Sequence, residues 1–195
     1  MLKRKNENIT EEGLEKLARE KWYFKYKQFQ RESNIFACLS IRMKLQLIGY
    51  DYAKDGDDCS RDFEDKYEKN DARTPSQFKI EGKTVWDYSN SEQGRDSIRW
   101  KYAVQEHQRW CANMICNGII PSDIEEIKLN GGRILDKRLH SNLTTMDGLV
   151  KYREIVAKAT GSSLEKNDVI RYDYQLMDDI VWLLHKCGYN LTKKK

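Results

Sequence analysis

Three long stretches of the chain space their apolar residues at intervals of three and four, and a glycine follows each stretch. This spacing places the apolar side chains on one face of an α-helix. Glycine adopts the left-handed conformation that commonly ends a helix, so each helix is expected to stop there. The stretches and their glycines are residues 32–48 with Gly49, residues 96–117 with Gly118, and residues 176–187 with Gly188. The chain is therefore expected to be mainly α-helical.

Two short segments have the pattern of β-hairpins. Residues 77–86 contain two short runs typical of strands and are expected to turn at residues 81–82. Residues 127–134 are expected to turn at Asn130-Gly131, because Asn-Gly favours the positive backbone dihedrals of a tight turn. The predicted fold class is therefore mainly α with short β-hairpins, a small α+β protein.

Charged residues mark two further segments. Thr10 can cap a helix that carries Glu11 and Glu12 in its first turn and runs through Tyr26. Residues 53–75 are rich in aspartate and glutamate, which suggests a calcium site. However, they lack the alternating carboxylates and central glycine of an EF-hand loop. A solvated loop or an exposed helix is expected there instead.

Two segments of the chain are similar to each other in sequence, and this similarity is hereafter called the internal echo. Residues 33–51 align without a gap with residues 172–190, and both segments consist of an amphipathic helix that ends in Gly-Tyr-Asp or Gly-Tyr-Asn. Chance can produce two helices that end in Gly-Tyr, since glycine commonly ends helices. The shared length and the shared polar start favour a duplicated half-module.

Composition limits the classes of partner. Of the 195 residues, 34% are charged and 39% are hydrophobic, with eleven Tyr and five Trp, so a folded globular protein is expected. The net charge of +4 comes largely from the basic runs at residues 3–5 and 193–195. Because the body is nearly neutral, nucleic acid is not expected as a partner.

The sequence also predicts a cytoplasmic protein that does not have a membrane as a partner. No run of eighteen apolar residues occurs, and residues 1–8 lack the apolar core of a secretory signal. The five cysteines are scattered and odd in number, so free, reduced thiols are expected. No cysteine pair has the spacing of zinc ligands, and no metal site is predicted.

The sequence Glu106-His107-Gln108-Arg109-Trp110 carries the most specific chemistry in the chain. On a helix, His107 and Trp110 lie one turn apart and share one face. Beside a cleft, an imidazole and an indole can stack on a planar ligand, and Arg109 can pair with a phosphate. The alternative is that Trp110 and His107 pack in the core and that Arg109 is a solvated surface residue.

This motif, with two later segments, resembles the ryanodine-receptor repeat, a small module found in that channel and in many bacterial and phage proteins. In those repeats a helix with an acidic-His-x-x-Trp motif precedes a turn glycine, a short hairpin, a His/Asn-containing segment and a final helix ending in Gly-Tyr. The corresponding residues here are 106–110, Gly118, the expected hairpin near 130–131, residues 139–143 and residues 188–191. Residues 32–34 and 44–50 resemble the segment that often precedes the motif in bacterial members.

The resemblance implies a division of the chain. Residues 1–52 would form an N-terminal helical part with a partial repeat, residues 53–97 an acidic linker or insert, and residues 98–191 a full repeat. Residues 192–195 would form a basic tail.

The resemblance also implies a function. In the channel, the tandem repeat resembles an adenine-nucleotide-binding unit, and bacterial members have been proposed to sense nucleotide-derived messengers. Carried over to this chain, the ligand-binding residues would be His107, Trp110, Glu106, Arg109 and His140. Arg138 is expected to lie near a phosphate together with Arg109 and His140. The expected role is to sense or sequester a nucleotide-derived small molecule in a cleft between the two units.

Two other classes of function remain open. An enzyme is not expected, because the chain has three histidines and lacks the common nucleophile, zinc-hydrolase and phosphate-loop motifs. No cofactor is expected either. A protein–protein adaptor or homo-oligomer is the alternative, because Ile119 and Met146 replace aromatic residues that the repeats usually have after the turn glycine and in the His/Asn segment. Such an adaptor would keep the fold and lose the ligand.

Overall fold

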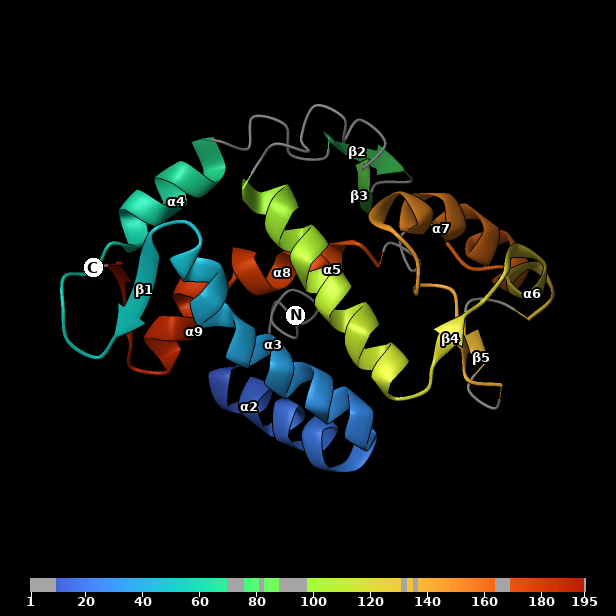
Figure 1. Cartoon of the computed structure of the whole chain (residues 1–195), viewed down its shortest axis with the longest axis horizontal. Helices are drawn as coiled ribbons and strands as arrows, with labels where there is room; N and C mark the ends of the chain where they lie inside the picture. The colour runs from blue at the N-terminus through green and yellow to red at the C-terminus, as the bar shows by residue number, and fades with distance from the viewer. Residues whose placement is uncertain are drawn as a thin grey trace.

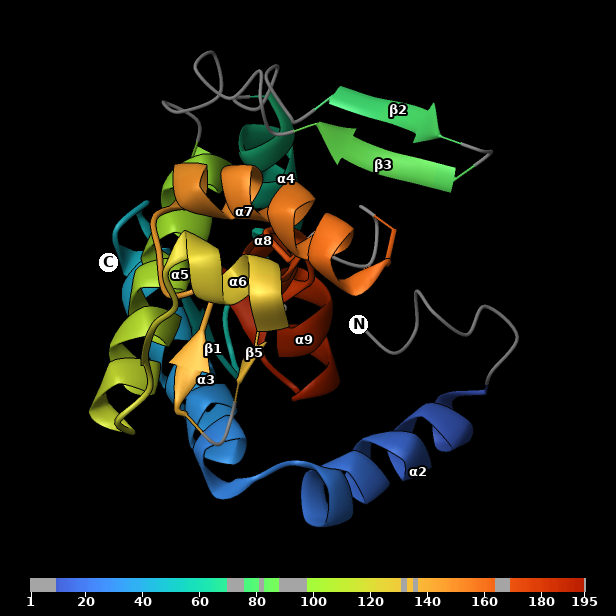
Figure 2. The ribbon, with the colours of Figure 1, turned by 90° about the vertical axis from the view of Figure 1, so that its right-hand side faces the viewer.

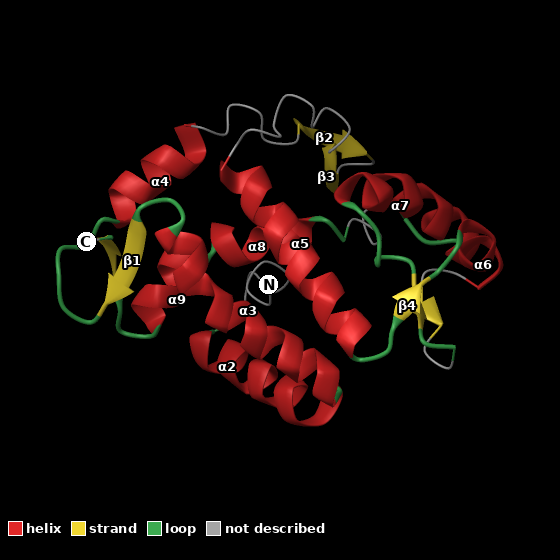
Figure 3. Cartoon of the chain, in the orientation of Figure 1, coloured by secondary structure: helices red, strands yellow, loops and turns green. Residues whose placement is uncertain are grey.

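The computed structural model describes residues 10–69, 76–80, 83–87, 98–130, 133–134, 137–163 and 169–194. These residues form a mainly helical protein with small β-sheets (Figures 1 and 3). The helical elements are α2 (Glu11–Glu20), the π-helix η1 (Lys21–Lys25), α3 (Gln28–Gln46), α4 (Ser60–Lys69), α5 (Ile98–Cys116), α6 (Ile124–Asn130), α7 (Met146–Thr160), α8 (Arg171–Asp178) and α9 (Ile180–Lys186). The strands are β1 (Tyr50–Ala53), β2 (Ser76–Ile80), β3 (Lys83–Asp87), β4 (Ile120–Pro121), β5 (Arg133–Ile134), β6 (Leu139–His140) and β7 (Asn190–Lys193).

The predicted helix ends are confirmed at the glycines. Gly49, Gly118 and Gly188 have φ values of +84°, +75° and +75°, the left-handed conformation that L-residues rarely adopt. The predicted N-cap is also confirmed, because the Thr10 side chain accepts a hydrogen bond from the Gly13 backbone N–H at 3.2 Å. The final helix differs from expectation, since it is interrupted at Asp179 and continues as α9.

Helix α3 begins at Gln28, four residues before the start expected from its apolar spacing. Gln30 accepts a hydrogen bond from the Lys27 backbone N–H at 2.9 Å, an N-terminal capping interaction that starts the helix earlier.

Helix α2 and η1 lead into α3, and α2 extends away from the main body (Figure 2). No described helix is both long enough and apolar enough to cross a membrane.

One of the two expected hairpins is confirmed. Strands β2 and β3 pair antiparallel with Ile80 opposite Lys83, and the turn residues 81–82 lie outside the described part of the chain.

The hairpin expected at residues 127–134 is wrong, because Ile124–Asn130 forms helix α6. Asp123 caps this helix by accepting a hydrogen bond from the Glu126 N–H at 2.8 Å, and Ile127 is fully buried. The N-cap and the burial of Ile127 outweigh the turn preference of Asn130-Gly131. Gly131 itself lies outside the described residues. Arg133–Ile134 instead pairs antiparallel with β6, which pairs in parallel with β4.

The two Gly-Tyr segments of the internal echo meet in space. Strand β1 follows α3 and strand β7 follows α9, and the two strands pair antiparallel. Tyr50 lies opposite Lys193, and Tyr52 opposite Leu191. The two helix–glycine–strand units thus contact each other through their strands, an arrangement compatible with the duplicated half-module that the sequence suggests.

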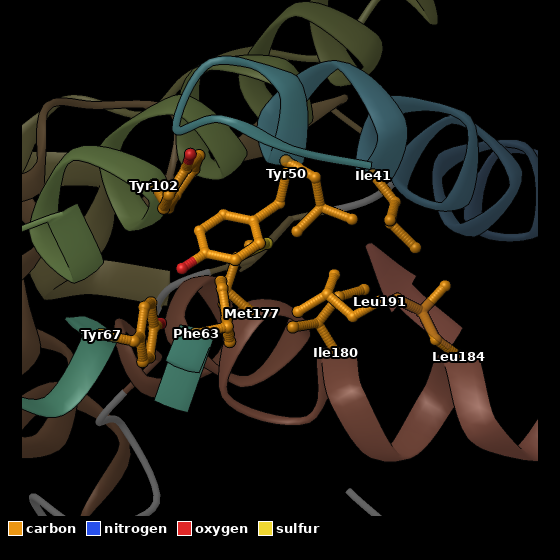
Figure 4. Packing of buried hydrophobic residues seen from close by; sticks show 10 residues of the cluster. Ile41, Tyr50, Phe63, Tyr67, Tyr102, Met177, Ile180, Leu184 and Leu191 are labelled. Atoms are coloured by element: carbon orange, nitrogen blue, oxygen red, sulfur yellow. The ribbon is translucent and has the colours of Figure 1, made fainter. Parts of the chain in front are cut away.

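The largest core cluster lies around this strand pair (Figure 4). Tyr50 is 1% exposed and packs edge-on against Phe63, whose ring stacks on Tyr67. Phe63 and Tyr67 belong to α4, within the acidic segment expected to be solvated. That expectation is therefore wrong for one face of the helix, because two aromatic residues four positions apart outweigh the surrounding carboxylates.

Helix α5 connects this cluster to the rest of the molecule. Tyr102 of α5 belongs to the largest cluster, while Trp100 and Ala103 pack in a second cluster with α7 and α8. Its C-terminal half contributes Met114 to a third cluster with Ile119. The helix therefore contacts α3 and α8 directly and packs against α7 through the second cluster. It runs through the middle of the fold in Figure 1.

Candidate functional site

A cavity of about 370 Å³ opens between the N-terminal part of α3, the middle of α5, β6 and the start of α8. Aromatic side chains form much of its wall: Tyr26, Phe29, Trp110, His140 and Tyr172. Gln30, Ser33, Asn34 and Gln175 add neutral polar groups. Concave sites with apolar walls and a few convergent polar groups are typical of small-molecule pockets, whose volumes begin at about 300 Å³.

Two of the wall aromatics, Trp110 and His140, and the buried His107 behind them pack against one another. The Trp110 indole stacks on the His107 imidazole, with ring centroids 5.9 Å apart and an interplanar angle of 23°. On another side, the His140 ring meets the indole edge-on at 5.3 Å and 78°. The His140 Nδ1 accepts a hydrogen bond from the Asn142 backbone N–H at 3.1 Å, which places the proton of the neutral imidazole on Nε2. Trp110 is thus held between two imidazoles and is partly buried.

A buried ion-pair network forms the floor of the cavity. Glu106 accepts two hydrogen bonds from Arg109, from Nε at 2.9 Å and from Nη2 at 2.7 Å. It also accepts one from the Lys44 Nζ at 2.6 Å. Burial raises the pKa of Glu106, but the two cations outweigh burial and hold the pKa below its usual value. Lys44 is 1% exposed and Glu106 7% exposed, so this ion pair is withdrawn from water, while Arg109 is partly exposed at the cavity.

Arg109 keeps one edge of its guanidinium unused. Its Nε and Nη2 bind Glu106, and Nη2 also reaches the Ser33 hydroxyl at 3.4 Å. Its Nη1 is buried and has no hydrogen-bond partner among the described residues. An unpaired buried donor costs about 1–3 kcal/mol, so an acceptor beside it is favourable.

Beside this network, His107 forms a second buried pair. Its Nδ1 lies 3.2 Å from the Asp173 carboxylate, and its Nε2 lies 2.8 Å from the Thr144 carbonyl oxygen. The carbonyl can only accept, so Nε2 carries a proton, and a further proton lies between Nδ1 and Asp173. Burial lowers the pKa of His107, but Asp173 and Cys111 raise it to about 10.

This arrangement restricts the available chemistry. Cys111 Sγ lies 3.5 Å from His107 Nε2, but that nitrogen donates to Thr144 and is not available as a base for the thiol. Both carboxylates of the site, Glu106 and Asp173, are already paired with cations. Within the described residues, no three histidine, cysteine or acidic side chains converge as a metal site.

The structure brings together most of the residues that the sequence nominated. Glu106, Arg109, Trp110 and His140 line the cavity. His107 lies behind the wall, 4% exposed, where it supports the Trp110 ring. Arg138 lies apart, on the surface beside Gly118, and does not line the cavity.

Two functional residues were missed in the sequence. Lys44 follows Ile41 by three positions and precedes Leu45, so it lies on the apolar face of α3; a lysine at such a position signals a buried partner. Asp173 occupies the polar start of the second echo segment, in the position of Asn34 in the first. Both Asp173 and Asn34 line the cavity, so the equivalent polar positions of the two echo segments lie at the site.

Compared with protein-family models, with curated proteins and with solved structures, the chain gives no match. The resemblance to the ryanodine-receptor repeat therefore depends on the motifs quoted above, and the geometry of the cavity carries the functional argument.

Proposed function

We propose that this protein binds a nucleotide-derived small molecule in the cavity between α3, α5 and α8, without catalysis, and so senses or sequesters it. The observation that carries the proposal is the combination of an aromatic wall with an arginine, Arg109, in the lining of one concave site. A nucleobase stacks on aromatic side chains, and a phosphate accepts hydrogen bonds from arginine. The amides of Gln30, Asn34 and Gln175 offer donors and acceptors for a base edge.

A thermal-shift screen tests this function. The panel contains ATP, ADP, ADP-ribose and its cyclic forms, and cyclic mono-, di- and oligonucleotides. A ligand present at a hundred times its Kd adds about 2.7 kcal/mol to the free energy of unfolding, which raises Tm by several degrees. A panel that leaves Tm unchanged throughout would contradict the proposed function.

Replacing Trp110 with alanine is expected to weaken binding of any ligand found in that screen by at least about fivefold. A base that stacks on an indole loses about 1–3 kcal/mol when the ring is removed. Isothermal titration measures the loss, and circular dichroism checks the fold. The matched control is Trp182→Ala, which removes a half-exposed indole from α9, away from the cavity, and is expected to leave Kd unchanged. Equal weakening by both substitutions would argue against a role of Trp110 in the site.

A second candidate function, protein interaction, is favoured by the outer face of α3. Five exposed apolar side chains form a continuous stripe along it, hereafter the α3 stripe: Ile35, Phe36, Leu39, Met43 and Leu47. Four of them follow the i, i+4 row that forms the packing ridge of a helix. Two copies of the same ridge can interdigitate across a two-fold axis, so a second copy of this chain is the proposed occupant.

Replacing Leu39 with glutamate is expected to abolish such a dimer. Leu39 is 70% exposed at the centre of the α3 stripe, so a charge there opposes association without disturbing the core. Sedimentation measurements over a range of concentrations report the oligomeric state. Ser40→Glu, on a neighbouring face of the helix, serves as the control. A monomer at all concentrations in the unmodified protein would exclude this second function.

A further inference from the structure

We propose that the cavity selects a nucleotide with a single negative charge, a cyclic mononucleotide phosphodiester, over nucleotides that carry two or more phosphate charges. This inference depends on the proposed function and narrows its ligand class. It follows from the charge that the buried side chains of the site carry together.

The floor network has a net charge of +1. Lys44 and Arg109 are cations and Glu106 is a carboxylate, and the three side chains are joined by hydrogen bonds of 2.6–2.9 Å. The carboxylate cancels one cation, and one positive charge remains at the partly buried floor of the cavity. Of the described residues that line the cavity, Arg109 is the only lysine or arginine.

The second buried pair adds no charge. His107 and Asp173 share the proton between Nδ1 and the carboxylate, so the pair is neutral whichever member holds it. His140 also remains neutral in this geometry, because its Nδ1 accepts a hydrogen bond. The net charge of these side chains of the site therefore stays at +1.

Arg31 lies near the cavity on α3 but is not among the residues that line it. Its Nη1 donates to the carbonyl oxygens of Tyr26 and Trp22 at 2.8 and 3.3 Å, at the C-terminal end of η1. That end of a helix carries partial negative charge and suits a cation. Of the described residues that line the cavity, Arg109 is therefore the cation that directly faces a ligand.

Charge balance then decides between classes of nucleotide. A phosphodiester carries one negative charge, which matches the single positive charge that Arg109 brings to the lining of the cavity. A 5′-monophosphate, a diphosphate or a triphosphate brings additional negative charge into a partly buried cavity without a matching cation, which opposes binding. A nucleoside brings no charge and leaves the positive charge of Arg109 without a counter-charge from the ligand.

The volume supports a single nucleotide. About 370 Å³ lies near the lower end of the range for ligand pockets, which suits one base, one ribose and one phosphate. A cyclic dinucleotide carries two bases and two negative charges, and the single lysine or arginine among the described lining residues matches only one of those charges.

Isothermal titration with matched probes tests the charge rule. The probes are the nucleoside, the 3′,5′-cyclic monophosphate, the 5′-monophosphate and the 5′-triphosphate of adenine and of guanine, with cyclic di-AMP and cyclic di-GMP. For the preferred base, the cyclic monophosphate is expected to bind at least tenfold more tightly than every other probe. Tighter binding of a triphosphate or a cyclic dinucleotide would overturn the inference and leave the proposed function standing. Absence of binding by all probes, in this panel and in the thermal-shift screen, would overturn both.

A single added lysine tests the same rule without disturbing the buried pairs. Asn34 is exposed on α3 and lines the cavity, and lysine has a higher helix propensity than asparagine. In Asn34→Lys, the affinity for the 5′-monophosphate relative to the cyclic monophosphate is expected to rise at least fivefold, because one more cation meets the second charge. Asn34→Gln is the neutral control and is expected to leave the ratio unchanged. A ratio that the lysine does not alter would overturn the charge rule.

Discussion

Replacing Glu106 with glutamine is expected to lower the free energy of unfolding by about 3–5 kcal/mol, because two buried cations then lose their common carboxylate. Lys44 is 1% exposed and donates to Glu106 at 2.6 Å, while Arg109 donates to both carboxylate oxygens. Glutamine keeps the size of the side chain and one oxygen acceptor, so the loss reports the charge. Chemical denaturation monitored by circular dichroism measures it.

The matched variant is Lys44→Met. It removes one cation, preserves the apolar stem and leaves Glu106 paired with Arg109 through two hydrogen bonds. We expect this substitution to cost less than half of what Glu106→Gln costs. Equal losses in the two variants would show that the buried lysine, and not the carboxylate, organises the network.

The free energy of unfolding is expected to fall, on the order of 3 kcal/mol, as the pH rises from 6.5 to 10. Burial lowers the pKa of His107, but Asp173 and Cys111 raise it from 6.5 to about 10. A group whose folded pKa lies above its unfolded pKa stabilises the protein fully below the unfolded value. That stabilisation is lost as the pH rises through the folded value, so the affected window lies between the two. Urea denaturation at intervals across this window measures the slope.

The contribution of His107 is isolated by His107→Gln. A glutamine amide can still donate to the Thr144 carbonyl oxygen, as the imidazole Nε2 does at 2.8 Å, but it does not titrate. The free energy of unfolding of the unmodified protein, minus that of His107→Gln at the same pH, is expected to decrease as the pH rises from 6.5 to 10. Other titrating groups contribute equally to both proteins and cancel in this difference. Parallel profiles would contradict the assignment of a raised pKa to this histidine.

Much of the fold could be predicted because its signals are local. The helix ends at Gly49, Gly118 and Gly188 follow from the freedom of glycine at positive φ, which depends on the residue and its neighbours alone. Residues 127–134 show the limit of such reasoning. Asn-Gly is a turn signal, but the cap at Asp123 and the burial of Ile127 in a helix decide the outcome. Burial depends on residues distant in sequence, which the local pattern does not contain.

The site was predicted in part for the same reason. One helix carries Glu106, Arg109 and Trp110, so their spacing reveals their proximity. Lys44 lies 62 residues before Glu106 and Asp173 belongs to α8, so only the tertiary fold brings them to the site. Arg138 was nominated for its charge, but its backbone adopts a φ of +56° in a surface turn beside Gly118. Charge alone does not report where a side chain lies.

The pairing of β1 with β7 has a consequence for the order in which this chain can fold. Tyr52 and Leu191 are opposite each other in that pair, about 140 residues apart in sequence. Leu191 is fully buried, in the same cluster as Leu45 and Phe63, so the ribosome must synthesise nearly the whole described chain before this cluster can be completed. Until then, the apolar faces of α3 and α4 lack their final partners. We therefore expect nascent chains that stop before β7 to expose them and to be the species that chaperones bind.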